Sequence, residues 1–130
     1  MKLLLDTHIW IWSILEPHRL TRRVARELSN PDNQLWLSSI SLWEIVLLHR
    51  KGRFRTPGGL PAWIANAMTT VPVVEAPLTF EVALAVSTLQ LSHGDPADQF
   101  LAASAKVLGL TLVTADRNLI HSPEISVLAN

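Results

Sequence analysis

Lys2-Leu3-Leu4-Leu5-Asp6-Thr7-His8 is the stretch of sequence that decides the fold. Its run of leucines does not alternate with polar residues, so a strand formed there is covered on both faces, as in the centre of a parallel sheet. Asp6 then stands at the carboxyl end of that strand. In open α/β sheets the ligand crevice lies outside these strand ends, which makes Asp6 a candidate functional acid. Asp is equally a favoured N-cap, so capping of the helix-like sequence that follows explains this position as well.

The composition is that of one ordinary globular domain, expected to span residues 1–130. Hydrophobic residues make up 48% of the chain and charged residues 17%, and the formal net charge is zero. The lack of cysteine excludes a disulfide framework and thiolate metal sites, and it fits a reducing compartment. Asp6, His8 and Glu16-Pro17 interrupt the first apolar stretch, which is therefore neither a signal peptide nor a membrane span. We expect a soluble, cytoplasmic protein with no membrane partner.

Strand-like and helix-like stretches alternate along the rest of the chain. Strands joined through helices by right-handed crossovers predict a parallel sheet with all carboxyl ends at one edge. Further strands are expected at 34–38, 71–74, 110–114 and 125–128. Helices are expected at 7–15, after an N-cap at Thr21, at 42–49, from Leu60-Pro61, at 80–91 with its apolar face in the core, and from Asp95 to Gly109.

Glu44 lies near the start of the predicted helix 42–49. Ser41-x-x-Glu44 matches a capping box, in which the glutamate reaches back to the N-cap amide. A glutamate one turn into a helix that follows a strand also lies at the carboxyl edge of the sheet, on the same side as Asp6. This segment alone leaves both roles open.

Two later segments place further acids at the same edge. In Asp95-Pro96-Ala97-Asp98 the first aspartate is the expected N-cap and the second lies in the first helical turn. Capping explains Asp95 well and Asp98 less fully. Asp116 directly follows the strand expected at 110–114, which repeats the pattern of the opening stretch.

Convergence of Asp6, Glu44, Asp98 and Asp116 at one sheet edge predicts a metal site. Neighbouring carboxylates repel one another and raise each other's pKa unless a cation neutralises them. Oxygen ligands without cysteine or suitably spaced histidine favour Mg²⁺ or Mn²⁺ over zinc. Such an ion suits phosphodiester hydrolysis, because it activates water and stabilises charge on the leaving oxygen.

Four segments together resemble a PIN domain, specifically the compact VapC-type toxin ribonucleases. They are Leu3-Leu4-Leu5-Asp6-Thr7-His8, Ser41-x-x-Glu44, Asp95-Pro96-Ala97-Asp98-Gln99-x-x-x-Ala103 and Leu112-Val113-Thr114-Ala115-Asp116. The resemblance spans nearly the whole chain and implies a three-layer α/β/α sandwich around a central parallel sheet with strand order 3-2-1-4-5. It also implies a Mg²⁺-dependent endoribonuclease, with Mn²⁺ as a substitute ion, that is the toxin of a type II toxin–antitoxin pair. RNA is then the substrate, and a homodimer and a VapB-like antitoxin are the implied assemblies.

The resemblance also implies roles for individual residues. The catalytic and metal-binding acids are Asp6, Glu44, Asp98 and Asp116, with Asp95 as an additional metal-binding acid and Thr7 and Thr114 as hydroxyls that support them. Gln99 stands where a basic residue is frequent, which affects a substrate or dimer contact rather than the metal site. Capping as the sole role of Glu44 then becomes the lesser interpretation, because it does not explain the other acids.

Several basic and aromatic residues are candidates for RNA contact. Arg117, next to Asp116, is the strongest, and Arg50, Lys51, Arg53 and Arg55 follow it. The residues Arg19, Arg22, Arg23 and Arg26 recur at helical spacing, as a solvated face or a phosphate-binding one. His8 and His93 are expected to be walls of the site, and Trp10, Trp12, Trp43 and Trp63 core or dimer surface, with base stacking the less favoured role.

Two other functions fit parts of the sequence. A non-catalytic PIN-like module that binds RNA or a protein is the main alternative, and the intact set of acids argues against it. An aspartyl-phosphate phosphatase on a similar sheet is disfavoured, because Asp6 has no second acid two residues further on.

Overall fold

The computed structural model describes residues 1–91 and 95–130. Its strands are β1 (Lys2–Leu5), β2 (Gln34–Ser38), β3 (Val74–Ala76), β4 (Thr111–Thr114) and β5 (Val127–Ala129). Its α-helices are α1 (Thr7–Leu15), α2 (Arg22–Ser29), α3 (Ser39–Arg50), α4 (Leu60–Thr70), α5 (Phe80–Ala85), α6 (Pro96–Leu108) and α7 (Arg117–Ile120). Two short 3-10 helices, η1 (Pro17–Arg19) and η2 (Val86–Thr88), follow α1 and α5.

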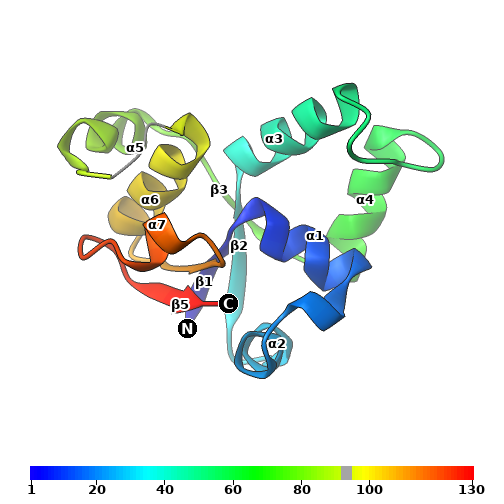
Figure 1. The fold of residues 1–130 in the computed structure, drawn as a ribbon, viewed down its shortest axis with the longest axis horizontal. Coiled ribbons are helices and arrows are strands. Elements are labelled where there is room, and N and C mark those ends of the chain that lie inside the picture. Colours follow the sequence, from blue (N-terminus) through cyan, green and yellow to red (C-terminus); the bar gives the residue numbers. More distant parts are fainter. Residues whose placement is uncertain (92–94) are drawn as a thin grey trace.

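The strands form one parallel sheet in the order β3-β2-β1-β4-β5, which confirms the predicted topology (Figure 1). β1 lies at its centre, where Leu5 is in register with Leu37 of β2 on one side and Val113 of β4 on the other. The backbone N–H of Asp6 continues the pairing with β4 by donating to the carbonyl of Val113 at 3.0 Å. The carboxyl ends of β1, β2 and β4 therefore meet at one edge.

The leucines of β1 divide between two hydrophobic cores, one on each face of the sheet. Leu3 and Leu5 pack with Trp10 and the other buried residues of α1 to α4, whereas Leu4 packs with Leu101 and the other buried residues of α6. All three leucines are fully buried. Burial on both faces explains why this strand has no polar alternation, and it confirms the expected three layers of helix, sheet and helix.

Aromatic side chains fill the core between α1 and α4. Trp10 is completely buried, and its ring meets that of Trp63 edge-on at 6.1 Å between centroids. Trp63 in turn makes an edge contact with Phe54 at 4.7 Å. Trp10 Nε1 donates to the carbonyl of Val71 at 3.3 Å, so the buried indole has a polar partner. Trp43, in contrast, is 49% exposed.

Three predicted caps, on two helices, are confirmed. Thr21 caps α2 by accepting from the N–H of Val24 at 3.2 Å, and Asp95 caps α6 by accepting from the N–H of Ala97 at 3.0 Å. Gly109 ends α6 in the left-handed conformation, with φ of 65°. This conformation costs residues with a Cβ atom free energy, which explains glycine at the end of this helix.

The structure excludes the capping box that the sequence left open for Ser41 and Glu44. Helix α3 begins at Ser39, three residues earlier than expected, because Ser38 is its N-cap and accepts from the N–H of Ile40 at 3.1 Å. Ser41 therefore lies inside the first turn and is fully buried. Glu44 has no N-cap at Ser41 to reach back to.

Two edge strands also differ from the expectation. β3 is Val74–Ala76 rather than 71–74, because the N–H of Val71 bonds to Ala67 as the end of α4 and Pro72 has no N–H to donate. β5 is Val127–Ala129 rather than 125–128, with Leu128 as its buried residue. Both strands are short, so their apolar pattern defines them poorly.

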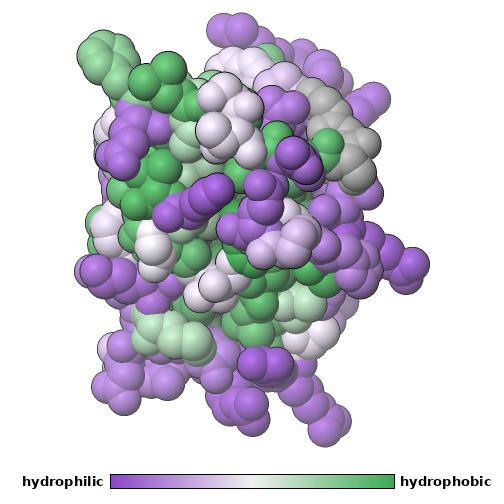
Figure 2. Space-filling model, turned by 90° about the vertical axis from the view of Figure 1, so that its left-hand side faces the viewer, coloured by the Kyte–Doolittle hydropathy of each residue, from purple (hydrophilic) through white to green (hydrophobic). Residues whose placement is uncertain are grey.

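The helix expected at 80–91 is shorter and less buried than predicted. α5 ends at Ala85 and is followed by η2, and Val82 is buried whereas Ala83 is exposed. Phe80 is 91% and Leu84 72% exposed. On the side of the molecule that carries α5, α6 and α7, hydrophobic surface lies among hydrophilic side chains (Figure 2). None of the helices in the described ranges is long and apolar enough to span a membrane.

Candidate active site

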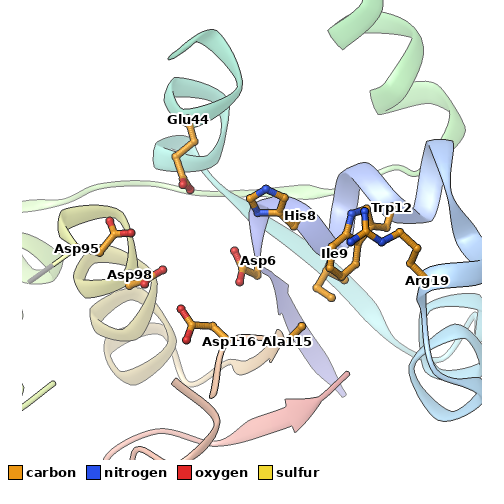
Figure 3. A pocket seen from close by; sticks show the side chains of 10 residues that line it. All are labelled: Asp6, His8, Ile9, Trp12, Arg19, Glu44, Asp95, Asp98, Ala115 and Asp116. Atoms are coloured by element: carbon orange, nitrogen blue, oxygen red, sulfur yellow. The ribbon is translucent and has the colours of Figure 1, made fainter. Parts of the chain in front are cut away.

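A cavity of about 540 Å³ opens at the carboxyl ends of the central strands. All five acids expected at this edge line it, and their carboxyl groups point toward a common space (Figure 3). They come from four separate parts of the chain: Asp6 after β1, Glu44 in α3, Asp95 and Asp98 at the start of α6, and Asp116 after β4.

Asp6 occupies the N-cap position of α1, but its side chain does not cap that helix. It accepts a hydrogen bond from the Thr114 hydroxyl instead, with 2.7 Å between Thr114 Oγ1 and Asp6 Oδ2. Thr114 Oγ1 also accepts from the backbone N–H of Asp116 at 3.0 Å. Capping therefore does not explain Asp6, and the fully buried Thr114 connects it to Asp116.

Glu44 is held by a second buried hydroxyl. Thr7 Oγ1 lies 2.5 Å from Glu44 Oε1 and 2.8 Å from Ser41 Oγ. A hydroxyl has one hydrogen and an ionised carboxylate can only accept, so Thr7 donates to Glu44 and Ser41 supplies the hydrogen of the other contact. Ser41 thus contributes to the site through Thr7. The only role expected for Ser41 from the sequence was in a capping box, so this one was not predicted.

Two of the remaining acids combine capping with a place in the cavity. Asp116 is the N-cap of α7 and accepts from the N–H of Asn118 at 2.9 Å, while Asp95 caps α6. Asp98, in the first turn of α6, is only 9% exposed. A carboxyl group this buried needs a partner of opposite charge or a proton.

Burial, together with repulsion between the acids, raises the pKa of several of these carboxyl groups. Burial raises the pKa of Asp98 to about 8, helped by the negative charges of Asp95, Asp6 and Asp116. A hydrogen bond between the Asp98 and Asp116 carboxyl groups acts in the same direction, and it requires a proton on one of them.

Two further carboxyl groups have raised pKa values for the same reasons. Burial raises the pKa of Asp6, and the hydrogen bond from Thr114 and the charge of His8 oppose this effect. Burial also raises the pKa of Glu44, against the hydrogen bond from Thr7.

This set of side chains fits a hard divalent cation. All the donors are carboxylate oxygens, and a cation among them would remove the repulsion that raises their pKa values. Within residues 1–91 and 95–130, no three acidic or histidine side chains already stand close enough together to hold a metal ion. The acids thus surround the cavity, and binding of an ion requires their side chains to close on it.

The opposite wall of the cavity is aromatic and basic. His8, Ile9, Trp12 and Arg19 line it, away from Asp95 and Asp98 (Figure 3). The rings of His8 and Trp12 are 6.0 Å apart, and the guanidinium carbon of Arg19 lies 4.1 Å from the centre of the Trp12 ring. Arg19 Nη1 also pairs with Glu16 Oε2 at 3.2 Å.

The basic residues expected to contact RNA do not line this cavity. Arg50 ends α3, Lys51 and Arg53 follow it, and Arg117 begins α7, all of them exposed. Arg55 lines a separate hollow with Phe54.

Arg19 was named as a possible phosphate contact from the sequence, but its place in the cavity lining was not predicted. It was grouped by helical spacing with Arg22, Arg23 and Arg26, but it belongs to η1, before α2 begins. Its contact with Trp12 crosses the break at Glu16-Pro17, so no periodic signal marks it. His93, the other expected wall residue, lies outside the described residues.

Comparisons with known proteins show the family of this chain. The PIN domain family matches residues 3–124. Ribonuclease VapC22 of Mycobacterium tuberculosis (strain ATCC 25618 / H37Rv) is 32% identical over 117 residues, which cover 89% of this chain and 88% of that protein.

Solved structures share the fold at lower sequence identity. One of these is the structure of VapBC2 from Rickettsia felis bound to a DNA fragment from the VapBC2 promoter. A chain of it superposes on this protein with a TM-score of 0.72 at 18% identity, covering 100% of this chain and 99% of that one. A chain of DNA-bound VapBC from Salmonella typhimurium gives a TM-score of 0.72 at 22% identity, covering 99% and 98%.

Proposed function

Because this chain belongs to the PIN domain family, we propose that it is a Mg²⁺-dependent endoribonuclease of the VapC type. One observation carries the proposal: acids from four distant segments line one cavity, and buried hydroxyls hold two of them. The similarity to Ribonuclease VapC22 supports RNA as the substrate. The whole chain, residues 1–130, is then a single PIN domain.

Asp6, Glu44, Asp98 and Asp116 would hold the ion, with Asp95 beside them and Mn²⁺ as a substitute. When bound, such an ion supplies the charge that activates water and stabilises the leaving oxygen of a phosphodiester. Thr114 and Thr7 hold Asp6 and Glu44 in fixed orientations, which lowers the entropic cost of closing the acids. Glu44, with its raised pKa and one oxygen occupied by Thr7, is suited to take a proton at the other oxygen.

The same proposal extends to biological role and partners. Similar solved structures are VapBC complexes, which supports a toxin that binds a VapB-like antitoxin. We also infer a homodimer, as the family resemblance implies, and a cytoplasmic location, as the composition and the N-terminal sequence led us to expect.

Two substitutions test the proposal. Asp6→Asn and Asp116→Asn keep the shape of the side chain and remove its charge, so RNA cleavage in Mg²⁺ should fall below detection while thermal unfolding remains cooperative. Asp32→Asn is the matched control, because Asp32 is exposed and does not line the cavity. Undiminished cleavage by either cavity variant would refute the proposal.

The non-catalytic alternative gives a different result in the same assay. Wild-type protein would then bind single-stranded RNA but leave it intact in both Mg²⁺ and Mn²⁺. The retention of every expected acid in the cavity favours the enzyme.

A further inference from the structure

We propose that Arg19, stacked on Trp12, binds a phosphate of the RNA strand beside the phosphodiester at the acids, and so determines substrate affinity. This inference rests on the proposed function. It replaces Arg117 and the cluster after α3 as the main RNA contact, because those residues do not line the cavity.

The first argument is the charge of the cavity. Five carboxyl groups line it, and they repel an RNA strand, whose phosphates are also negative. Among the described residues that line the cavity, Arg19 is the one lysine or arginine. A strand that reaches the acids therefore meets an arginine or lysine side chain within the cavity only at this wall.

The second argument is that Arg19 is held ready for a ligand. Its guanidinium carbon lies over the Trp12 ring at 4.1 Å from the ring centre, and Glu16 pairs with Nη1 at one end of the guanidinium. Arg has five N–H donors, so most remain available for phosphate oxygens. Stacking restricts the rotamers of a long side chain, which reduces the entropy lost when a phosphate binds.

The third argument is that stability does not require this arrangement. Arg19 and Glu16 are both about half exposed, and an exposed pair of this kind contributes little to folding. Arg19 also lies on the side of the cavity away from Asp95 and Asp98 (Figure 3). Its position is thus explained better by a ligand than by the fold.

The inference is tested with one single-stranded RNA oligonucleotide that carries a fluorescein label, for which both binding and cleavage are measured. Binding is measured by anisotropy in Ca²⁺ across a salt series, and cleavage by kinetics in Mg²⁺. Arg19→Gln should weaken binding and raise KM about five- to twentyfold, leave kcat within about twofold, and reduce the salt slope of log K by about 0.7. Arg26→Gln, which removes a charge from the exposed face of α2, should change none of these.

Two further variants separate charge from stacking. Arg19→Lys keeps the charge and should retain the salt slope while recovering part of the affinity. Trp12→Leu removes the aromatic ring that contacts the guanidinium of Arg19. It should weaken RNA binding less than Arg19→Gln does, again with the salt slope retained. Thermal unfolding of each variant identifies any that fail to fold, and Arg19→Lys then carries the test.

Each outcome decides the inference separately from the proposed function. If wild type cleaves RNA and Arg19→Gln matches Arg26→Gln in affinity and salt slope, the inference is wrong and the function stands. A loss of kcat at unchanged KM also overturns it. If wild type binds RNA through Arg19 without cutting it, the inference stands and the proposed function fails. Wild type that neither binds nor cuts overturns both.

Discussion

The hydroxyl of Thr114 donates a 2.7 Å hydrogen bond to the carboxylate of Asp6 and joins the ends of two neighbouring strands. The same oxygen accepts the backbone N–H of Asp116 at 3.0 Å. One completely buried side chain therefore sets the positions of two acids that lie far apart in the sequence.

Thr114→Val should impair the acids without destroying the fold. Valine has nearly the same shape but leaves Asp6 without its donor and the N–H of Asp116 without its acceptor. Loss of such a supporting group lowers metal affinity or activity about 10- to 100-fold, and we expect this for Mg²⁺-dependent cleavage. Titration calorimetry with Mg²⁺ measures the affinity directly. Thr111→Val, at the other end of β4, is the control, and equal effects of the two would contradict the prediction.

Thr7→Val should shift the pH dependence of cleavage. The hydrogen bond from Thr7 lowers the pKa of Glu44, so its removal raises that pKa further. If Glu44 acts as a carboxylate, the acidic limb of the pH–rate profile then moves to higher pH. Thr7→Ser retains the hydroxyl and should keep the wild-type profile. A profile that is the same in Thr7→Val would show that this bond does not tune Glu44.

The metal-free protein should lose stability as the pH rises from about 4 to 8. The pKa of Asp98 is raised to about 8 in the folded protein from an ordinary value of 3.8. The folded state therefore keeps a proton that the unfolded chain releases, so the stabilisation is full below about pH 4 and is lost as the pH passes 8. The raised pKa values of Asp6 and Glu44 act in the same direction.

Urea unfolding at pH 5 and pH 8, with and without Mg²⁺, measures this effect. Without metal, the free energy of unfolding should fall by at least about 1 kcal/mol between the two pH values, since one pKa unit corresponds to about 1.4 kcal/mol. Mg²⁺ should restore it at pH 8. Asp98→Asn should flatten the metal-free dependence, whereas Asp32→Asn should not. Metal-free stability that increases toward pH 8 would contradict the raised pKa.

Gly109→Ala should destabilise the protein by about 1 kcal/mol through the backbone alone. The φ of 65° is unfavourable for a residue with a Cβ, yet nothing lies within 4 Å of a Cβ placed there. Asparagine tolerates this conformation better, so Gly109→Asn should cost less. Urea unfolding ranks the variants, and RNA cleavage should remain near the wild-type rate. Equal stability of all three proteins would show that α6 does not depend on this cap.

The central part of the fold was predictable because a strand buried on both faces has an uninterrupted run of apolar residues in the sequence. The uninterrupted leucines of β1 pack on both faces of the sheet, and the acids at the strand ends follow from the parallel topology. The strand order itself came from the family resemblance, since periodicity alone does not order strands.

The errors lie where contacts between distant residues decide the outcome. Ser38, Ser39 and Ser41 are all suitable N-caps by residue type, but Ser38 caps α3 and Ser41 bonds to Thr7 across 34 positions of sequence. Arg19 was assigned to a helical stripe because its spacing fits, whereas the break at Pro17 turns it onto Trp12. Neither contact has a local signature.

The pairing of β1 with β4 has a consequence for the newly made protein. A ribosome releases Asp6 early, but Thr114 and Asp116 emerge only after roughly a hundred more residues have been joined. Until then Asp6 has neither its hydroxyl donor nor its neighbouring acid, and the cavity does not exist. If the protein cuts RNA as proposed, its nascent chain therefore cannot cut the message that encodes it until the second half of the sheet has been added.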